Sequence, residues 1–380
     1  MRSSRIVYWV GFRIAIGYFA LSHDAALGQS HSVNLQQTYP IPDPVLGEEI
    51  REGEIDAAAR LIATLRKEIQ TVYKDGDARR DAHPKAHGCV SAEFEVHADL
   101  PQSLQHGVFQ PKARYEALIR YSNGSPNASG KDITGDTRGM AVKLFGVPGE
   151  KLFPIPEQPD IQDFILISSP YFFINEAEGY AEFFEIVDEG AGWDLLKIPF
   201  ILGPRGSWNA YKMLSQTIAN PLTTRYWSVV PYQLGEEDQR QAVKYSAKPC
   251  EASDQQIPDN PGDNYLRQAM VSTLSNGDAC MTFMVQPRTG DLSVEDAILE
   301  WPEEEAPFYP IATITIPAQQ FNTPINNAAC ENQSYNPWHA LPAHKPLGMV
   351  NRLRRVVYES ISNLRHEMNS TQIPNSGEAQ

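Results

Sequence analysis

The sequence predicts an α+β protein built on an antiparallel β-sheet or barrel. Short segments of alternating apolar and polar residues, typical of half-buried strands, recur along the chain. Helical segments are inserted between them without the regular alternation that marks a parallel βαβ fold. With 380 residues, of which 42% are hydrophobic and 21% charged, the chain has an ordinary globular composition and can bury a sizeable core.

The clearest strand pattern follows Cys89, where Val90, Ala92, Phe94 and Val96 alternate with polar residues. Strands are expected at residues 90–96, 115–121, 139–145, 163–167, 227–232, 242–247, 281–286 and 311–316. Helices are expected at residues 48–72, 176–187, 263–276 and 348–368, with a helical, proline-broken stretch at 193–223.

The N-terminus resembles a secretory signal peptide. Arg2 and Arg5 precede an apolar stretch at residues 6–21, and small residues follow at 25–28. We therefore expect a signal peptide at residues 1–29, an exported domain at 30–369 and a disordered tail at 370–380. Because Arg13 interrupts the apolar stretch, an uncleaved membrane anchor or an incorrectly assigned start is the alternative.

Charge and cysteine content exclude several classes of function. A net charge of −15 gives no broad attraction to nucleic acid phosphates, so no nucleic acid partner is expected. The four cysteines permit one or two disulfides in an oxidising compartment, or are scattered, partly buried thiols. None lies in a CxxC pair, which argues against a covalently attached haem and a thiolate zinc site.

One predicted helix carries a tyrosine between two arginines. Residues four and seven apart lie on one side of a helix, so Arg354, Tyr358 and Arg365 are expected to share a face. A neighbouring guanidinium stabilises a phenolate by charge attraction, and tyrosine is an established axial ligand of haem iron. Tyr358 is therefore a candidate iron ligand, and Arg365 could meet a haem propionate. The alternative is a surface helix with ordinary charged residues.

Two further groups could carry chemistry. Cleaving a peroxide needs a base that takes a proton from one oxygen and returns it to the other, a role that suits His83 or His87. A strand, a turn and a second strand would bring Arg120, Ser122 and Arg138 together, where arginines could hold carboxylates. The alternatives are a polar loop with local hydrogen bonds and an ordinary hairpin.

Taken in order, these motifs resemble those of the catalase superfamily. The family's R-x-x-H-x-K-x-x-G is matched by Arg80, His83, Lys85 and Gly88, F-E-V by residues 94–96, R-F-S by 120–122, D-x-R-G-x-A-x-K by 136–143, T-P-x-F-F by 169–173, and R-x-x-x-Y by Arg354 and Tyr358. Arg365 falls where the family keeps another arginine. The match is dense over residues 80–185 and resumes at 350–365.

The resemblance implies a catalase-like antiparallel β-barrel with surrounding helices and a C-terminal helix on the proximal side of haem b. It makes His83 the distal acid–base residue, helped by Ser122, and Tyr358 the iron ligand, polarised by Arg354. The residues it implies for cofactor binding are Arg80, Arg120, Arg138, Phe172, Arg354 and Arg365.

Departures from the family pattern bear on the substrate. Ile167 stands where we expect the family's distal asparagine, so a hydrogen-bond donor is lost or replaced by serine. A more apolar distal wall favours organic or fatty-acid hydroperoxides over efficient hydrogen peroxide disproportionation. An extra residue before Phe94 leaves both His83 and His87 as distal candidates, with His83 preferred. The chain is also shorter than typical catalases and resembles the smaller catalase-related haem proteins.

These observations predict a haem-dependent peroxidase or weak catalase that takes a small peroxide or lipid hydroperoxide and an unidentified electron donor. One alternative is a hydroperoxide isomerase or lyase of the same fold, which needs no external reductant. Another is an exported haem-binding protein without turnover. A homo-oligomer is also compatible with the resemblance.

Overall fold

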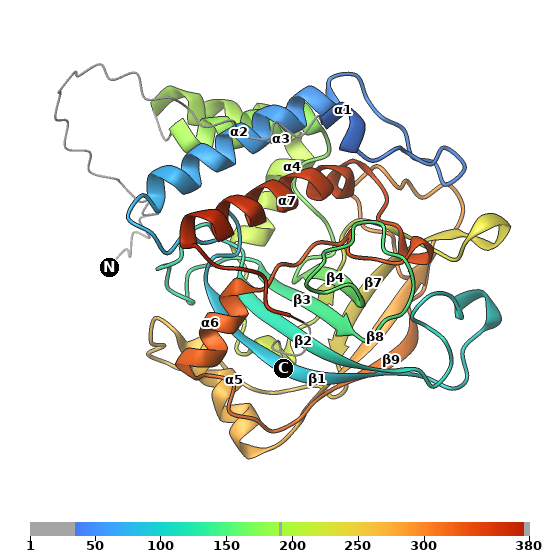
Figure 1. Ribbon diagram of the computed structural model, residues 1–380. Helices are drawn as coiled ribbons and strands as arrows, with labels where there is room; N and C mark the ends of the chain where they lie inside the picture. The colour runs from blue at the N-terminus through green and yellow to red at the C-terminus, as the bar shows by residue number, and fades with distance from the viewer. Residues whose placement is uncertain (1–34, 190–191, 376–380) are drawn as a thin grey trace, which may run out of the picture. The chain divides into compact units, whose positions relative to one another are not determined.

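The computed structural model describes residues 35–189 and 192–375, whose strands form a closed antiparallel barrel (Figure 1). The strands are β1 (Ala86–Val96), β2 (Arg114–Asn123), β3 (Arg138–Phe145), β4 (Ile161–Ile167), β5 (Tyr226–Trp227), β6 (Tyr232–Leu234), β7 (Gln241–Pro249), β8 (Ala279–Pro287) and β9 (Tyr309–Ile316). The ring runs β1-β2-β3-β4-β5-β7-β8-β9 and back to β1, while β6 pairs only with β7 among these strands. The predicted antiparallel barrel is therefore confirmed.

The shortest strand closes the barrel. In β5, Trp227 pairs with Ile167 of β4, and Tyr226 pairs with Ala247 of β7. Inside the barrel, aromatic rings fill the core: Phe94 and Phe283 lie 5.2 Å apart between ring centroids in an edge-on arrangement. Each such buried ring stabilises the fold by roughly 1.5–3 kcal/mol.

Helices cover parts of the outer face of the barrel. They are α1 (Leu35–Thr38), α2 (Glu54–Val72), α3 (Ala177–Glu189), α4 (Ile198–Leu214), α5 (Tyr265–Asn276), α6 (Pro324–Asn332) and α7 (Met349–Asn369), with five short 3₁₀ turns, η1 (Gln102–Leu104), η2 (Gly192–Lys197), η3 (Pro221–Thr223), η4 (Glu237–Gln239) and η5 (Pro342–His344). Helices α2, α3 and α7 pack on one another, whereas α5 and α6 contact β1 (Figure 1). The inner face of α2 explains its helical pattern, since Ala57, Leu61, Leu65 and Ile69 are buried at spacings of four residues.

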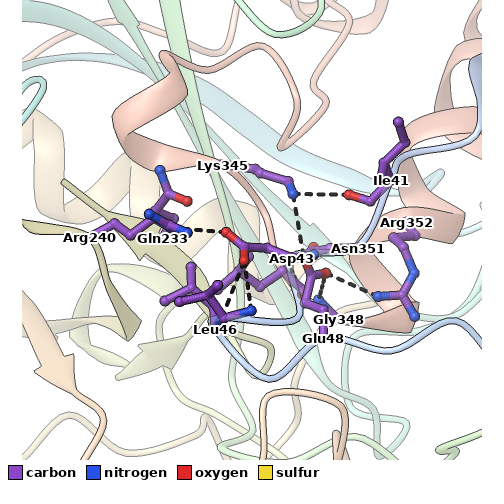
Figure 2. A network of polar contacts seen from close by, with 12 residues as sticks. Ile41, Asp43, Leu46, Glu48, Gln233, Arg240, Lys345, Gly348, Asn351 and Arg352 are labelled. Carbon is purple, nitrogen blue, oxygen red and sulfur yellow. Dashed lines mark hydrogen bonds and ion pairs between the residues drawn. The ribbon is translucent and has the colours of Figure 1, made fainter. Parts of the chain in front are cut away.

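The N-terminal arm is tied to α7 by a buried group of charges, here called the Arg352 cluster: Arg352, Glu48, Glu54 and Glu295. Arg352 donates to Glu54 Oε1 at 2.6 Å, Glu48 Oε1 at 3.0 Å and Glu295 Oε1 at 2.8 Å. Figure 2 shows Glu48 between Arg352, the Gly348 amide and Lys345. Because every charge in the cluster has a partner, the arrangement fixes where α7 begins.

Two disulfides join distant parts of the barrel region. Cys89 of β1 is bonded to Cys330 of α6, and Cys250, which follows β7, is bonded to Cys280 of β8. All four cysteines are thus paired, so the protein has two disulfides, the larger of the two numbers that the sequence allowed. The first disulfide holds α6 and the segment after it against the barrel.

Three elements differ clearly from the sequence-based expectation. The helix predicted from residue 48 begins at Glu54, because Glu48 lies in a loop that serves the Arg352 cluster. The strand predicted at 227–232 is two short strands, separated where Val229 adopts φ 66° ahead of Pro231. Helix α6 was not predicted; it starts at Pro324, with the Thr323 side chain capping it.

The predicted disordered tail is partly ordered. Ile373 packs beside the Cys89–Cys330 disulfide, and the Pro374 carbonyl accepts a hydrogen bond from Gln158 at 2.8 Å. Residues 376–380 and the predicted signal peptide at 1–29 lie outside the described residues. Among the described helices, none combines the length and the hydrophobicity needed to span a bilayer.

Candidate functional site

A pocket lies between the outer face of the barrel and α7. The empty space there amounts to about 730 Å³ when the open mouth of the pocket is counted. The lining residues come from the segment before β1, from β2, β3 and β4, from the segment after α6, and from α7: Arg80, Ala82, His83, Arg120, Ser122, Gly139, Met140, Ala141, Ile165, Leu166, Gln333, Ser334, Tyr335, Tyr358, Ile361, Ser362 and Arg365.

Strand alternation builds the barrel side of the pocket. On β2, Ile119 and Tyr121 enter the barrel core, so Arg120 and Ser122 face outward into the pocket. On β3, the outward residues Gly139 and Ala141 are small, which leaves room in front of the sheet. On β4 the outward residue is Ile165, which makes this part of the wall apolar.

His83 and Ser122 form a hydrogen-bonded pair in this wall. The His83 Nδ1 atom lies 3.0 Å from Ser122 Oγ, and the His83 backbone has φ 61°. Burial, together with the nearby Arg120 guanidinium, lowers the pKa of His83 to about 3, so its ring is neutral at physiological pH. In the tautomer whose Nδ1 donates to Ser122 Oγ, Nε2 is the ring atom that can accept a proton.

Gly139 makes this pair possible. A Cβ atom at this position would lie 2.7 Å from both His83 Nδ1 and Ser122 Oγ, closer than real Cβ contacts. Any larger residue would therefore displace the pair.

Tyr358 faces the pocket from α7, in line with Ile361, Ser362 and Arg365 at spacings of three, four and seven residues. Arg354 lies one turn earlier. Burial alone would lower the pKa of Arg354, but the phenol oxygens around it, led by that of Tyr358, raise it above its ordinary value. The Tyr358 hydroxyl therefore lies next to a positively charged guanidinium, that of Arg354. Histidine, cysteine, aspartate and glutamate form no metal-holding group of three or more in the described part of the chain.

Three arginines line the pocket: Arg80, Arg120 and Arg365, here called the pocket arginines. Two of them are held by the segment that follows α6. Arg80 forms an ion pair with Glu331 at 2.6 Å and donates to the Gln333 carbonyl at 2.5 Å. Arg365 donates to the carbonyls of Glu331 and Gln333 at 2.6 and 3.2 Å. The Cys89–Cys330 disulfide lies directly before this segment in the chain.

Two of the pocket arginines, Arg120 and Arg365, are incompletely satisfied. Arg120 donates to the His83 carbonyl at 2.7 Å and forms no ion pair within the described residues. The buried Nε atoms of Arg120 and Arg365 have no hydrogen-bond partner. Burial and the charge of Arg80 lower the pKa of both Arg120 and Arg365 to about 9. Arg80 and Arg365 share one carboxylate, Glu331, and Arg120 has none within the described residues, which leaves an excess of positive charge that suits an anionic ligand with two carboxylates.

Three of the residues that the sequence predicted for the site, His87, Arg138 and Phe172, do not line this pocket. His87 is buried beside Asn123, with Nε2 2.9 Å from Asn123 Oδ1, and does not line the pocket. Arg138 is held by Asp136 at 3.2 Å and by the Asp132 carbonyl at 2.8 Å, on the opposite face of β3 from Gly139. Phe172 packs with the helical core, where its ring centroid lies 4.6 Å from that of Phe173 in a tilted arrangement.

Sequence reasoning missed most of the apolar wall and the segment after α6. Ile165 is the apolar residue of β4 that faces the pocket. The motif comparison had singled out Ile167, which packs with the helical core instead. Strand alternation could have identified Gly139, Ala141 and Ile165. Gln333 and Tyr335 follow a helix that was not predicted, and no signal in the sequence marked them.

The comparisons with known proteins concern the fold. No family model and no curated protein sequence matches the chain. A fungal catalase structure superposes with a TM-score of 0.61 and 18% identity, over 83% of this chain and 65% of that one. Catalase A from Saccharomyces cerevisiae gives 0.58 and 18%, over 82% and 68%. A bacterial catalase gives 0.57 and 14%, over 96% and 71%.

The chain has a catalase-like fold. At these identities the likeness extends to the fold alone, and the chain spans about 65% of the fungal catalase's length. The expected resemblance to catalases is confirmed at that level. In this catalase-like barrel, the site is formed where β2, β3 and β4 face α7.

Proposed function

We propose that the protein binds haem b in the pocket between the barrel and α7 and uses it to break down hydroperoxides. One observation carries the proposal. A single pocket has Tyr358 on the helix side, the neutral His83–Ser122 pair in the barrel wall, and three arginines, two of which have a buried Nε atom without a hydrogen-bond partner. When bound, the haem supplies the iron at which the peroxide O–O bond is broken.

The residues of the pocket fit that cofactor. Tyr358 would ligate the iron, and the adjacent Arg354 guanidinium would stabilise its phenolate. The pocket arginines would hold the two propionates, which would balance their excess charge and occupy the free Nε atoms of Arg120 and Arg365. The apolar wall at Ala141, Ile165 and Ile361 would exclude water from the faces of the ring.

His83 would move the proton. Its Nε2 atom would accept the proton from one peroxide oxygen and donate it to the leaving oxygen, while Ser122 keeps Nδ1 engaged. The low pKa of His83 keeps the accepting form populated at neutral pH. For a peroxidase, the balanced reaction takes a hydroperoxide, two electrons from a donor and two protons to an alcohol and water.

The apolar wall favours a second candidate. With Ile165 as the outward residue of β4, this strand offers an organic hydroperoxide an apolar contact. A hydroperoxide isomerase or lyase of the same fold would rearrange such a substrate without a reductant.

Activity measurements separate these functions. Protein loaded with haem would be given hydrogen peroxide, cumene hydroperoxide or linoleic acid hydroperoxide, each with and without an electron donor. Consumption that requires the donor supports a peroxidase, and donor-independent conversion of the lipid hydroperoxide supports the isomerase or lyase. His83→Gln should lower kcat about 10²–10⁴-fold. His97→Gln, which changes a histidine outside the pocket, should leave it unchanged. Haem binding without consumption of any peroxide would contradict both enzymatic functions.

A further inference from the structure

Exposed apolar side chains are concentrated in one stretch of the chain. Of the fourteen exposed large hydrophobic residues in the described part, seven fall within residues 187–214. Six belong to the consecutive elements η2 and α4, and they define the docking face: Trp193, Leu196, Phe200, Trp208, Tyr211 and Leu214. Trp193 is 86% exposed and Phe200 is 87% exposed, which is unusual for side chains of this size.

The docking face belongs to a firmly anchored helix. The inner face of α4 is buried at Leu202, Gly206 and Met213. A Cβ atom at Gly206 would lie 2.4 Å from the Phe173 carbonyl oxygen, so the helix backbone touches its neighbour there. Asn209 also donates to the carbonyls of Phe172 and Ile298 at 2.8 and 2.9 Å. Because the inner face accounts for the packing of α4, its outer apolar residues have no role in it.

Helix α4 is interrupted within the docking face, so that residues of this face lie on two helical pieces. Gly203 has φ 62°, and Pro204 follows it, so two helical pieces meet at this point. Phe200 lies before the interruption and Trp208 after it. Trp208 and Tyr211 stack with their ring centroids 5.4 Å apart, which presents a broad aromatic surface.

The charge around the docking face differs from that of the whole chain. The protein has 47 acidic residues and a net charge of −15, yet residues 195–235 contain no aspartate or glutamate. Arg205 and Lys212 lie on α4 and form no ion pair within the described residues. Lys212 lies 3.9 Å over the Tyr171 ring, and Lys197 pairs with Asp194 at 2.8 Å.

Two acidic residues near the end of the neighbouring helix α3 are engaged elsewhere. Glu185 pairs with Arg60 of α2 at 2.6 Å, and Asp188 pairs with Lys67 of α2 at 2.7 Å. They therefore add little negative charge to the docking face.

We propose that the docking face binds the surface of a lipid bilayer containing anionic lipids. Tryptophan and tyrosine are favoured at the headgroup level, and phenylalanine and leucine can enter the acyl boundary beside them. Arg205 and Lys212 complement the negative headgroups, each contributing attraction near the surface. A second copy of the chain is a poorer occupant, because its identical face would bring like charges together. The proposal does not depend on haem or on peroxide turnover.

Vesicle flotation tests the proposal with the full-length protein. The probes are vesicles of phosphatidylcholine alone and of phosphatidylcholine with phosphatidylglycerol. The wild type should partition to the anionic vesicles, less so at high salt. The triple variant Trp193→Ser/Phe200→Ser/Trp208→Ser should partition at least about tenfold less. A matched variant, Ile41→Ser/Val45→Ser/Ile325→Ser, removes equally exposed apolar residues elsewhere and should partition as the wild type does.

Two further readings complete the test. Arg205→Glu/Lys212→Glu should weaken binding to anionic vesicles several-fold without affecting the neutral ones. Hydrogen–deuterium exchange should slow in peptides covering residues 192–214 when anionic vesicles are added. No vesicle binding by the wild type, equal binding by the triple variant, or protection confined to residues 1–34 would each overturn the proposal. So would a dimer in sedimentation analysis that only the triple variant abolishes.

Discussion

Arg352 and Arg365 lie on the same helix, α7, and both are almost fully buried, yet their surroundings are opposite. Arg352 reaches three carboxylates at 2.6 to 3.0 Å. Arg365 reaches two backbone carbonyls, its Nε atom has no partner, and its nearest carboxylate oxygen, on Glu331, is 3.7 Å away. Burial acts on both, but the carboxylates raise the pKa of Arg352, whereas the pKa of Arg365 falls to about 9.

The difference separates a structural site from a ligand site. In the Arg352 cluster each charged side chain is hydrogen-bonded to another, so no ligand is needed to satisfy it. Arg120 and Arg365 each keep an Nε atom that the protein's own residues do not pair, and an unsatisfied buried donor costs roughly 1–3 kcal/mol. Such a deficit is expected where a ligand completes the hydrogen bonding.

The largest expected effect is on the Arg352 cluster. Arg352→Met would leave Glu48, Glu54 and Glu295 buried without their partner, so the free energy of unfolding should fall by about 3–5 kcal/mol. Urea unfolding monitored by circular dichroism measures it. A loss below about 1 kcal/mol would mean that the cluster is not the structural centre described here.

The Cys89–Cys330 disulfide links fold and pocket. Cys89→Ala/Cys330→Ala should lower the free energy of unfolding by roughly 2–5 kcal/mol, because the bond spans 241 residues. It should also weaken haem binding, since the segment that holds Arg80 and Arg365 loses its anchor. Cys250→Ala/Cys280→Ala is the matched control: it should cost stability but leave the dissociation constant for haem unchanged.

The pocket arginines should behave in the opposite way to Arg352. Arg365→Met or Arg120→Met should change the stability of the haem-free protein by less than about 1 kcal/mol, because an ill-paired charge is removed. Either change should raise the dissociation constant for haem about ten- to hundredfold, as charge-assisted hydrogen bonds are lost. Arg288→Met, outside the pocket, serves as the control. If either variant were strongly destabilised but bound haem with unchanged affinity, the arginine would be a structural residue and not part of a ligand site.

The smallest effect concerns pH. The pKa of His83 is lowered from 6.5 to about 3, so the neutral ring persists as the pH falls. Peroxide consumption should therefore stay level between about pH 8 and 5, and the stability that the neutral ring contributes should be lost only as the pH falls from about 6.5 toward 3. A rate that declines with a midpoint near 6.5 would show that His83 is not the proton acceptor, or that its pKa is ordinary.

The sequence predicted the strands of the barrel, because their alternation is set by one buried face. It also identified six residues that line the pocket, among them His83, Ser122 and Tyr358, through ordered motifs. Arg138 was expected in the pocket but does not line it, because it lies on the same side of β3 as Met140, which faces the barrel core. Gly139 lies on the other side of the strand, which faces the pocket. The segment after α6 depends on a disulfide and on long-range hydrogen bonds to Arg80 and Arg365, which no local pattern encodes.

The central claim is that Tyr358 is the iron ligand of a bound haem, and an absorption titration tests it most directly. Haem would be added to the wild type, to Tyr358→Phe and to Tyr335→Phe, which changes the other tyrosine lining the pocket. The wild type and Tyr335→Phe should give a ferric tyrosinate spectrum, and Tyr358→Phe should lose it. A wild type that binds no haem, or a Tyr358→Phe variant with an unchanged spectrum and affinity, would contradict the claim.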